Sequence, residues 1–409
     1  MRIALFILFS LTASLSFSQT VKILFDASSA ETAGSADWVI DADQHNLGFN
    51  SGPAVVGTGD ESNAQKTATP AQSGITGSTA ETYWKGALSS WGIDLVQYGY
   101  NVETLPYNGQ ITYGNTFNAQ DLSNYQVFII CEPNIVFTSS EKTAIIQFVQ
   151  NGGGLFMVSD HDVSDRNGDG WDSPHIWNDL MTNNTVQSNP FGISFDYDNF
   201  SQTSTNIPNL PADSVLHGPY GNVTKVMWSN GTTMTLNTAQ NSSVKGVVYK
   251  TGSSFGNSNV MAAYARYGNG KVAAIGDSSP CDDGSGDPND ALYDGWITDA
   301  SGNHEKLIMN MTIWLVERIS PNAAVEEQTP AHWMLYPNPA QDAATLHISY
   351  PADAQALFTV FDVYGKECMH INNPANDYIL HFTDLAPGIY FYAFYLDGKC
   401  QGIKKLVKQ

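Results

Sequence analysis

Acidic side chains follow four apolar, strand-like segments of the sequence, at the point where each segment ends. Asp26 follows the segment Val21–Phe25, and Glu132 follows Tyr125–Cys131. Ser159, Asp160, His161 and Asp162 follow Leu155–Val158. Asp277 and Ser278 come shortly after Lys271–Ile275. In an open α/β sheet, ligands bind at the carboxyl ends of the strands, so these acids are expected to share one crevice. Each acid taken alone also suits a turn or a helix cap.

His161 stands between two of these acids and is the best candidate for a general acid–base or a metal ligand, ahead of His175 and His45. We therefore predict a catalytic group of Asp160, His161, Asp162 and Asp277. One histidine among several carboxylates suits a hard cation or a mixed site better than zinc, so a divalent metal is expected here. A solvent-exposed or capping His161 is the alternative.

The segment Asp165–Asp172 carries oxygen side chains at alternate positions, at Asp165, Asn167 and Asp169, followed by glycine at the sixth position. This spacing matches the first half of a calcium loop, in which alternate side chains turn inward. Ile176 stands at the twelfth position, where an EF-hand has glutamate, so Asp172 would have to complete the shell. We predict a structural Ca²⁺ held by Asp165, Asn167, Asp169 and Asp172; a hydrogen-bonded Asx-rich turn is the alternative.

Two long acidic loops extend the set of pocket candidates. The loop Asp277–Asp294 holds six aspartates and no apolar periodicity, and Glu31–Asp43 follows the first strand. Long loops without structure of their own are usually functional in compact domains. The pocket candidates are Asp26, Glu31, Glu132, Ser278, Asp282 and Asp283.

Charge is unevenly distributed over the 409 residues. Acids outnumber bases 40 to 18, giving a formal net charge of −22, and 29 of the acids are aspartate. A chain so poor in lysine and arginine is not expected to bind nucleic acid. With 42% hydrophobic residues it can bury real cores, and its length allows two or three domains.

The two ends of the chain differ from its middle. Residues 1–18 combine Arg2, the apolar stretch Ile3–Leu11 and small residues before Gln19, as in a secretory signal peptide. No later run has the roughly 20 apolar residues of a spanning helix. Residues 321–332 are expected to be a linker. Beyond them, short strand-like runs alternate with turn residues, which predicts an all-β, Ig-like sandwich over 333–409.

Several ordered motifs in this last part carry a family resemblance. They are Leu335–Ala340 (LYPNPA), Val360–Gly365, Leu385–Tyr390 (LAPGIY) and Lys404–Lys408. The segment resembles the C-terminal sorting domain of Bacteroidetes proteins exported by type IX secretion. The resemblance implies contact with that secretion machinery and a secreted or cell-surface destination, reached through the periplasm and the outer membrane. An appended adhesion or binding module is the alternative. This segment has seven acids and five lysines, so nearly all of the imbalance belongs to residues 20–320.

Residues 20–320 alternate apolar strands with amphipathic helices, which predicts a mostly parallel, flavodoxin-like α/β sheet with helices on both faces. Expected elements include strands at Ile93–Gln97 and Leu155–Val158 and helices at Ser139–Gln150, capped by Ser139, and at His304–Val316. The order of a helix, a Gly-rich turn and a strand in QFVQNGGGLFMV resembles class I glutamine amidotransferase-like domains, and among them the ThuA-like proteins associated with sugar utilisation.

The same resemblance argues against amidotransferase activity. Those enzymes place a nucleophilic cysteine on the turn after the strand that matches Leu155–Val158, and this chain has Ser159 there. Cys131 ends a different strand and is expected to be structural or disulfide-bonded. It and Cys281 could meet only if their strands end on the same side of a sheet, whereas Cys368 and Cys400 are expected to pair within the last domain.

Three functions remain open. The first is a secreted, divalent-metal-dependent hydrolase acting on an extracellular glycan or related polymer. The second is a non-catalytic, calcium-stabilised glycan-binding protein. The third is a peptidase-like enzyme with Ser159 or Ser278 as nucleophile, although neither serine has a G-x-S-x-G context.

Overall fold

The computed structural model describes most of the chain, in two compact units of residues 1–320 and 321–409. The described residues are 21–30, 38–41, 65, 69, 71–107, 109–165, 167–285, 293–296, 302–317, 332–350, 355–375, 377–396 and 399–409. The predicted signal peptide (1–18), nearly all of the predicted linker (321–332) and Glu31 lie outside them. No helix among the described residues is long and apolar enough to cross a membrane.

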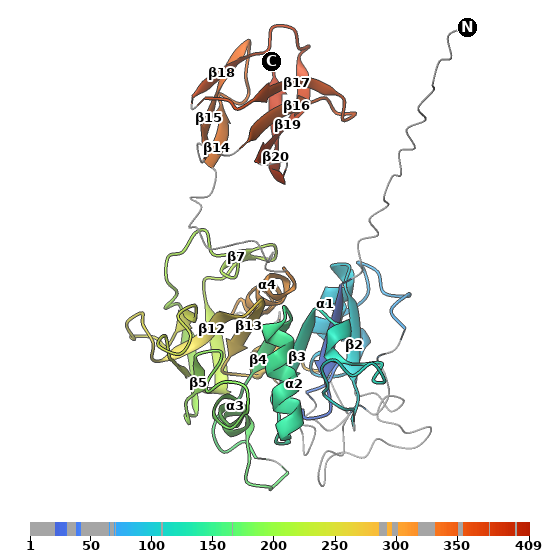
Figure 1. The fold of residues 1–409 in the computed structure, drawn as a ribbon, viewed down its shortest axis with the longest axis vertical. Coiled ribbons are helices and arrows are strands. Elements are labelled where there is room, and N and C mark those ends of the chain that lie inside the picture. Colours follow the sequence, from blue (N-terminus) through green and yellow to red (C-terminus); the bar gives the residue numbers. More distant parts are fainter. Residues whose placement is uncertain are drawn as a thin grey trace, which may run out of the picture. The chain divides into compact units, whose positions relative to one another are not determined.

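The first unit is built on five parallel strands (Figure 1). They are β1 (Lys22–Asp26), β2 (Asn101–Leu105), β3 (Val127–Cys131), β4 (Gly154–Val158) and β13 (Gly270–Ile275). Their order across the sheet is β2-β1-β3-β4-β13, and each neighbouring pair is parallel. This is the flavodoxin-like order, so the predicted fold class is confirmed.

Antiparallel strands extend the sheet beyond β13 to nine strands. They are β12 (Val260–Tyr267), β10 (Met234–Leu236) and β5 (Ile193–Phe195), with β11 (Lys245–Tyr249) also paired to β12. Two short ribbons lie outside the sheet, β6 (Phe200–Ser204) with β9 (Val226–Gly231) and β7 (His217–Gly218) with β8 (Gly221–Asn222). The sheet is therefore mixed, and only its five-strand part follows the predicted parallel pattern.

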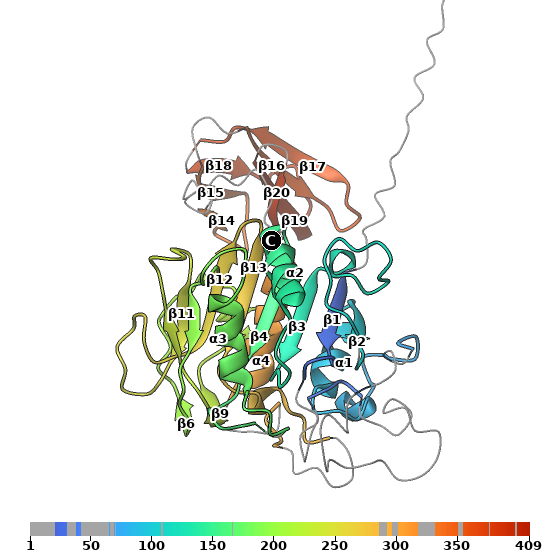
Figure 2. The ribbon, with the colours of Figure 1, turned by 60° about the horizontal axis from the view of Figure 1, so that its bottom comes forward.

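Helices cover both faces of the sheet because its central strands are apolar on both sides. In β3, Ile129 and Cys131 pack into one core with α1 (Ser89–Gln97) and α4 (His304–Val316). Phe128 and Ile130 point the other way, into a second core with α2 (Ser139–Gln150) and α3 (Ser173–Thr182). Figure 2 shows α2 and α3 in front of the sheet. Three 3-10 turns complete the unit: η1 (Glu81–Tyr83), η2 (Leu122–Asn124) and η3 (Ser279–Cys281).

The segment Ile93–Gln97 is helical, so its prediction as a strand is wrong. It forms the second half of α1. Leu88, directly before the helix, and Trp91 and Leu95 within it have helical spacing and are all buried. The strand of this region is β2, which starts four residues later, after Gly99 adopts a φ of +102°. The short apolar run was compatible with either structure.

Two details of the helices also differ from expectation. Helix α2 is capped by Thr138 and not by Ser139. The Thr138 hydroxyl accepts from the Glu141 N–H, and the Glu141 carboxylate accepts from the Thr138 N–H. Helix α3 was not anticipated, because its start overlaps the predicted calcium loop. It begins after Asp172 with Pro174 in its first turn.

The second unit is an antiparallel β structure of two sheets. One sheet joins β14 (His332–Tyr336), β15 (Ala343–Ser349) and β18 (Tyr378–His381); the other joins β17 (Glu367–Asn372), β16 (Ala356–Phe361), β19 (Gly388–Leu396) and β20 (Lys399–Lys408). Trp333, Phe358 and Phe394 share its buried core. The all-β prediction is confirmed, but the expected Cys368–Cys400 bond is wrong. Cys368 is a free thiol on β17, and β20 lies at the opposite edge of that sheet.

Trp91 supplies a test of this packing. Its ring is fully buried and packs edge-on against Phe25 and Phe156 and parallel to Trp296. We expect Trp91→Ala to lower the free energy of unfolding by about 3–5 kcal/mol, measured by urea denaturation. The control is Phe117→Ala, at a side chain 98% exposed, which should change it by less than about 0.5 kcal/mol. Equal effects from both variants would contradict the packing described.

Candidate functional site

The acids that follow the parallel strands lie along one edge of the sheet. Their strands β1, β3, β4 and β13 are direct neighbours, and Asp26, Glu132, Asp160 and Asp277 are each at most 6% exposed. The charge of Asp160 contributes to the raised pKa of Asp277, although burial is the larger cause. The tertiary structure therefore brings Asp160 and Asp277 together at the ends of β4 and β13.

Asp26 closes the turn after β1. Its carboxylate accepts from the N–H groups of Ser28 (2.8 Å) and Ser29 (3.2 Å) and from both serine hydroxyls. Burial nevertheless raises the pKa of Asp26. Ser29 O in turn accepts from Asn134 N at 2.6 Å, which ties this turn to the loop after β3. Asp26 thus has a structural role as a turn acceptor.

Glu132 is held in an unusual position directly after β3. Its backbone has a φ of +43°, in the left-handed region, and its N–H donates to Val158 O at 3.0 Å. The side chain is 2% exposed, and within the described part of the chain its Oε2 has no hydrogen-bond partner. A buried carboxylate oxygen of this kind is costly unless a cation, a proton or water meets it.

Asp160 and His161 form a close pair at the end of β4. His161 Nδ1 lies 2.6 Å from Asp160 Oδ2, and the histidine side chain is 17% exposed. Asp277 faces this pair from β13, and its two oxygens accept from Ser229 N (2.5 Å) and Ser279 N (2.9 Å). A carboxylate bound to Nδ1 leaves Nε2 of the neutral ring to act as the base.

The third predicted catalytic acid, Asp162, groups with Asp172, which caps helix α3, and with His175 in the first turn of that helix. Ligand atoms of Asp162, Asp172 and His175 lie within 4.8 Å of one another, and this is the one such cluster among the described residues. His175 Nδ1 is 2.5 Å from Asp172 Oδ1 and 3.6 Å from Asp162 Oδ1. We call these three residues the Asp–Asp–His cluster.

Local structure explains why this cluster forms. Asp172 caps α3: its Oδ1 accepts from His175 N, and its Oδ2 accepts from Val163 N at 2.6 Å. A cap and the residue three positions later share one helix face, so His175 lies over Asp172. The His175 ring also stacks on Tyr197, with centroids 4.1 Å apart. A D-x-x-H pattern opening a helix was the signal in the sequence.

The four residues of the predicted calcium loop do not have a common arrangement in the structure. Asp165 accepts from the N–H groups of Gly168 (2.7 Å) and Gly170 (2.8 Å), and Asn167 and Asp169 each accept from the N–H two residues on. These are Asx-turn bonds, as in the alternative expectation. Asp172 is turned toward α3 and joins the Asp–Asp–His cluster. The calcium loop itself stays a prediction.

The loop after β13 uses its acids for backbone bonds. Asp282 accepts from Gly284 N (2.8 Å) and Tyr293 N (2.7 Å). Asp283 accepts a hydrogen bond from the N–H of Ser90, in the first turn of α1, at 2.8 Å. The residue before this helix, Leu88, makes no side-chain cap of its own. A carboxylate at a helix N-terminus satisfies a free N–H and complements the helix dipole. This loop therefore helps to fix α1 on the sheet.

Neither candidate serine has the surroundings of a nucleophile. Ser159 and Ser278 are at most 1% exposed. The Ser159 hydroxyl donates to Asp160 O and accepts from the Ser173 hydroxyl, and in the described residues no histidine bonds to either serine. A nucleophilic serine needs a base within hydrogen-bond reach. The peptidase-like function therefore has no structural support here.

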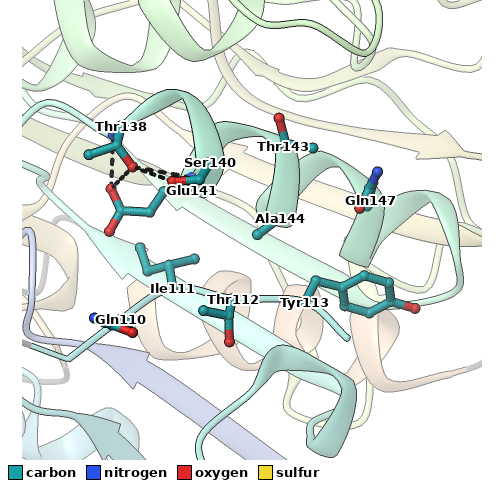
Figure 3. Close-up of a pocket in the computed structure, with 10 residues that line it drawn as sticks. All are labelled: Gln110, Ile111, Thr112, Tyr113, Thr138, Ser140, Glu141, Thr143, Ala144 and Gln147. Carbon is teal, nitrogen blue, oxygen red and sulfur yellow. Dashed lines mark hydrogen bonds between the residues drawn. The ribbon is translucent and has the colours of Figure 1, made fainter. Parts of the chain in front are cut away.

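A separate pocket of about 610 Å³ lies along α2 (Figure 3). One wall is the segment 110–113 and the other is α2 together with its cap, Thr138. Its polar lining is mostly hydroxyl and amide groups, with one aromatic ring, Tyr113; its only acid, Glu141, is bonded to Thr138. None of the acids predicted from the sequence lines this pocket.

Comparison with protein families identifies the C-terminal segment. Residues 334–409 match the family described as "Secretion system C-terminal sorting domain". The chain is accordingly a cargo of type IX secretion, destined for the cell surface or the medium. No curated protein matches the sequence.

Solved structures similar to this chain share low sequence identity with it. A ThuA-like protein from Parabacteroides merdae is 11% identical, with a TM-score of 0.34, over 73% of this chain and 90% of that one. A cytoplasmic protein from Salmonella typhimurium LT2 is 13% identical, with a TM-score of 0.36, over 72% and 99%. The fold of the first unit is established by its strand order.

Buried acids give this unit an expected dependence on pH. Burial raises the pKa of Asp282 to about 8, of Asp94 to about 7 and of Asp283 to about 6. The unfolded chain releases these protons near pH 4, so between those values the folded state holds more protons and loses stability as pH rises. We expect the free energy of unfolding to increase as the pH is lowered from about 8 toward 5.

Two variants make this expectation specific. Asp282→Asn should flatten the slope of stability against pH, above all between about pH 6 and 8. Asp384→Asn, at an exposed residue of the second unit, should leave the slope unchanged. Urea denaturation at several pH values is the measurement, and stability that falls steadily from pH 8 to pH 5 would contradict the expected sign.

Proposed function

We propose that this chain is an exported hydrolase that uses a divalent cation held by the Asp–Asp–His cluster. The observation that carries the proposal is the position of this cluster beyond β4: Asp162 follows the Asp160–His161 pair directly, and Asp172 and His175 lie at the start of α3. Carboxylate and imidazole ligands suit divalent transition metals and leave positions open for water. When bound, such a cation lowers the pKa of a coordinated water and polarises the bond to be cleaved.

The residues around the cluster have separate roles in this proposal. Asp160 orients His161 through Nδ1, so His161 Nε2 accepts the proton of the attacking water and later returns it to the leaving group. Burial and the nearby charge of Asp160 raise the pKa of Asp277, which favours the protonated form of Asp277 beside the Asp160–His161 pair. Tyr197 holds the plane of His175 by stacking.

The substrate class follows from location and from the surface that the protein offers. A cargo of type IX secretion meets polymers outside the cell. The chain has few bases with which to hold an anionic polymer. We therefore propose a neutral or weakly charged glycan as the substrate.

Cation binding tests the cluster independently of any substrate. We expect His175→Ala to weaken Mn²⁺ or Zn²⁺ binding, measured by isothermal titration calorimetry, by at least about 10-fold, because one of three ligands is lost. The control is His347→Ala, at a half-exposed histidine that pairs with Asp377 in the second unit, and it should bind as the wild type does. Equal affinities for all three proteins would refute the metal site.

Activity tests the rest of the proposal. On a panel of glycans, turnover should disappear with chelator, and His161→Ala should reduce it by about 10²–10⁴-fold while cation binding persists, because the general base is lost. Cation binding without turnover on any glycan would leave a metal-stabilised protein and would refute the hydrolase.

A second candidate function, glycan binding without hydrolysis, is supported by the pocket along α2. Its amide and hydroxyl side chains and the Tyr113 ring are the groups that bind neutral sugars by hydrogen bonds and stacking. Gln147 and Tyr113 lie at one end of this pocket (Figure 3).

This candidate has its own test. We expect Tyr113→Ala to weaken the binding of a soluble neutral oligosaccharide by about 10-fold, because loss of a stacking ring removes about 1 kcal/mol or more. Tyr364→Ala, at a side chain 92% exposed in the second unit, is the control and should have no effect. Calorimetric titration with and without chelator also separates this pocket from the cation site.

A further inference from the structure

Two cysteines that are 150 positions apart in the sequence are brought together by the parallel sheet. Cys131 is the last residue of β3 and pairs with Val158 of β4, which pairs in turn with Ile275 of β13. The three strands therefore end level, on the same side. Cys281 follows six residues after Ile275, in η3, and a side-chain hydrogen bond joins its thiol to that of Cys131.

Both thiols are buried in one apolar core. Cys131 is 1% exposed and Cys281 is 0% exposed, and they belong to the cluster that also holds Trp91, Trp228 and Trp296. Both are free thiols in the structure. Two thiols in contact within one buried core have the sequence separation and the placement of a long-range cross-link.

The surroundings exclude two other uses of the pair. Burial is the main cause that raises the pKa of both thiols, and the charge of Glu132 adds to it at both. The raised pKa disfavours the thiolate that a nucleophile or a metal ligand needs. Among the described residues the pair is not part of a cluster of three or more ligands, since the one such cluster is Asp162, Asp172 and His175. A four-ligand thiolate metal site is not formed here.

We propose that the exported protein carries a disulfide between Cys131 and Cys281, which ties the end of β3 to the loop after β13. The chain leaves the cytoplasm, and disulfides form and persist in such compartments. The oxidant is a disulfide of a thiol–disulfide exchange protein or small molecule outside the cytoplasm. The bond would hold the segment Asp277–Asp283 against β3 and so keep Asp277 beside Asp160.

The electrons and protons balance in two exchange steps. The thiolate of one cysteine attacks a sulfur of the oxidant's disulfide, forming a mixed disulfide and releasing one thiol of the oxidant. The second cysteine, as thiolate, attacks its partner's sulfur in the mixed disulfide and releases the other. The two cysteines lose two electrons and two protons, and the oxidant ends as two thiols. Because the folded core excludes the oxidant, the bond forms before η3 closes over β3.

Thiol labelling of the full chain, exported through a disulfide-forming periplasm, tests this proposal. The protein is quenched with acid, unfolded in denaturant so that burial cannot protect a thiol, and alkylated with iodoacetamide before or after reduction. Peptide mass spectrometry should find Cys131 and Cys281 unlabelled before reduction, labelled after it, and joined in one linked peptide. Quantitative labelling of both without reduction would overturn the proposal, as would a bond from either to Cys368 or Cys400.

Variants and stability provide a second measurement. Cys281→Ser should expose Cys131 to labelling without reduction, whereas the control Cys368→Ser should leave the pattern unchanged. Reductant should lower the Tm of the wild type by about 5–10 °C, because the bond closes a long loop, and should not change the Tm of the double serine variant. If reductant leaves the wild-type Tm unchanged and both thiols are labelled without reduction, the proposed disulfide is refuted. None of these results depends on cation binding or hydrolysis.

Discussion

The carboxylates buried at the carboxyl edge of the parallel sheet set the main constraint on this protein. Four neighbouring strands, β1, β3, β4 and β13, end at the same edge, and an acid follows each of them. Several lysines of the first unit form ion pairs away from this edge, for example Lys142 with Asp179 and Lys245 with Asp213. Burying a charge without a partner is expensive, so the fold has to satisfy these acids by other means.

Three means are visible along this edge. Backbone N–H groups serve Asp26, Asp282 and Asp283, which thereby hold turns and the start of α1 in place. Burial raises the pKa of Asp277 and so favours its neutral, protonated form. His161 forms a hydrogen bond with Asp160, and His175 forms one with Asp172. The acids met by histidine lie on the loop between β4 and α3, and this is where a hydrolytic site is proposed.

The acids bonded to the backbone and the acids that contact histidine have different consequences for stability and function. Acids bonded to backbone N–H groups stabilise the loops that follow the strands. The Asp–Asp–His cluster retains free ligand positions, because Asp162 is only partly buried and His175 is half-exposed. Glu132, with one oxygen unmet among the described residues, lies beside the Cys131–Cys281 contact, so cross-linking and charge burial occur at the same place in the sheet.

The sequence by itself determined the two-domain organisation, the sorting domain, the parallel sheet and the edge on which the acids fall, because strand periodicity and the residue after each strand are local properties. Its prediction of Ile93–Gln97 as a strand was wrong, because a short apolar run suits a strand or a helix. Only the tertiary structure decided which acids meet: Asp172 was assigned to a calcium loop but caps α3 beside His175 and Asp162. It also placed Cys131 against Cys281. The contacts of Asp162 with His175 and of Cys131 with Cys281 join residues far apart in the sequence. They depend on strand order and on how each loop folds back over the sheet, which no local pattern encodes.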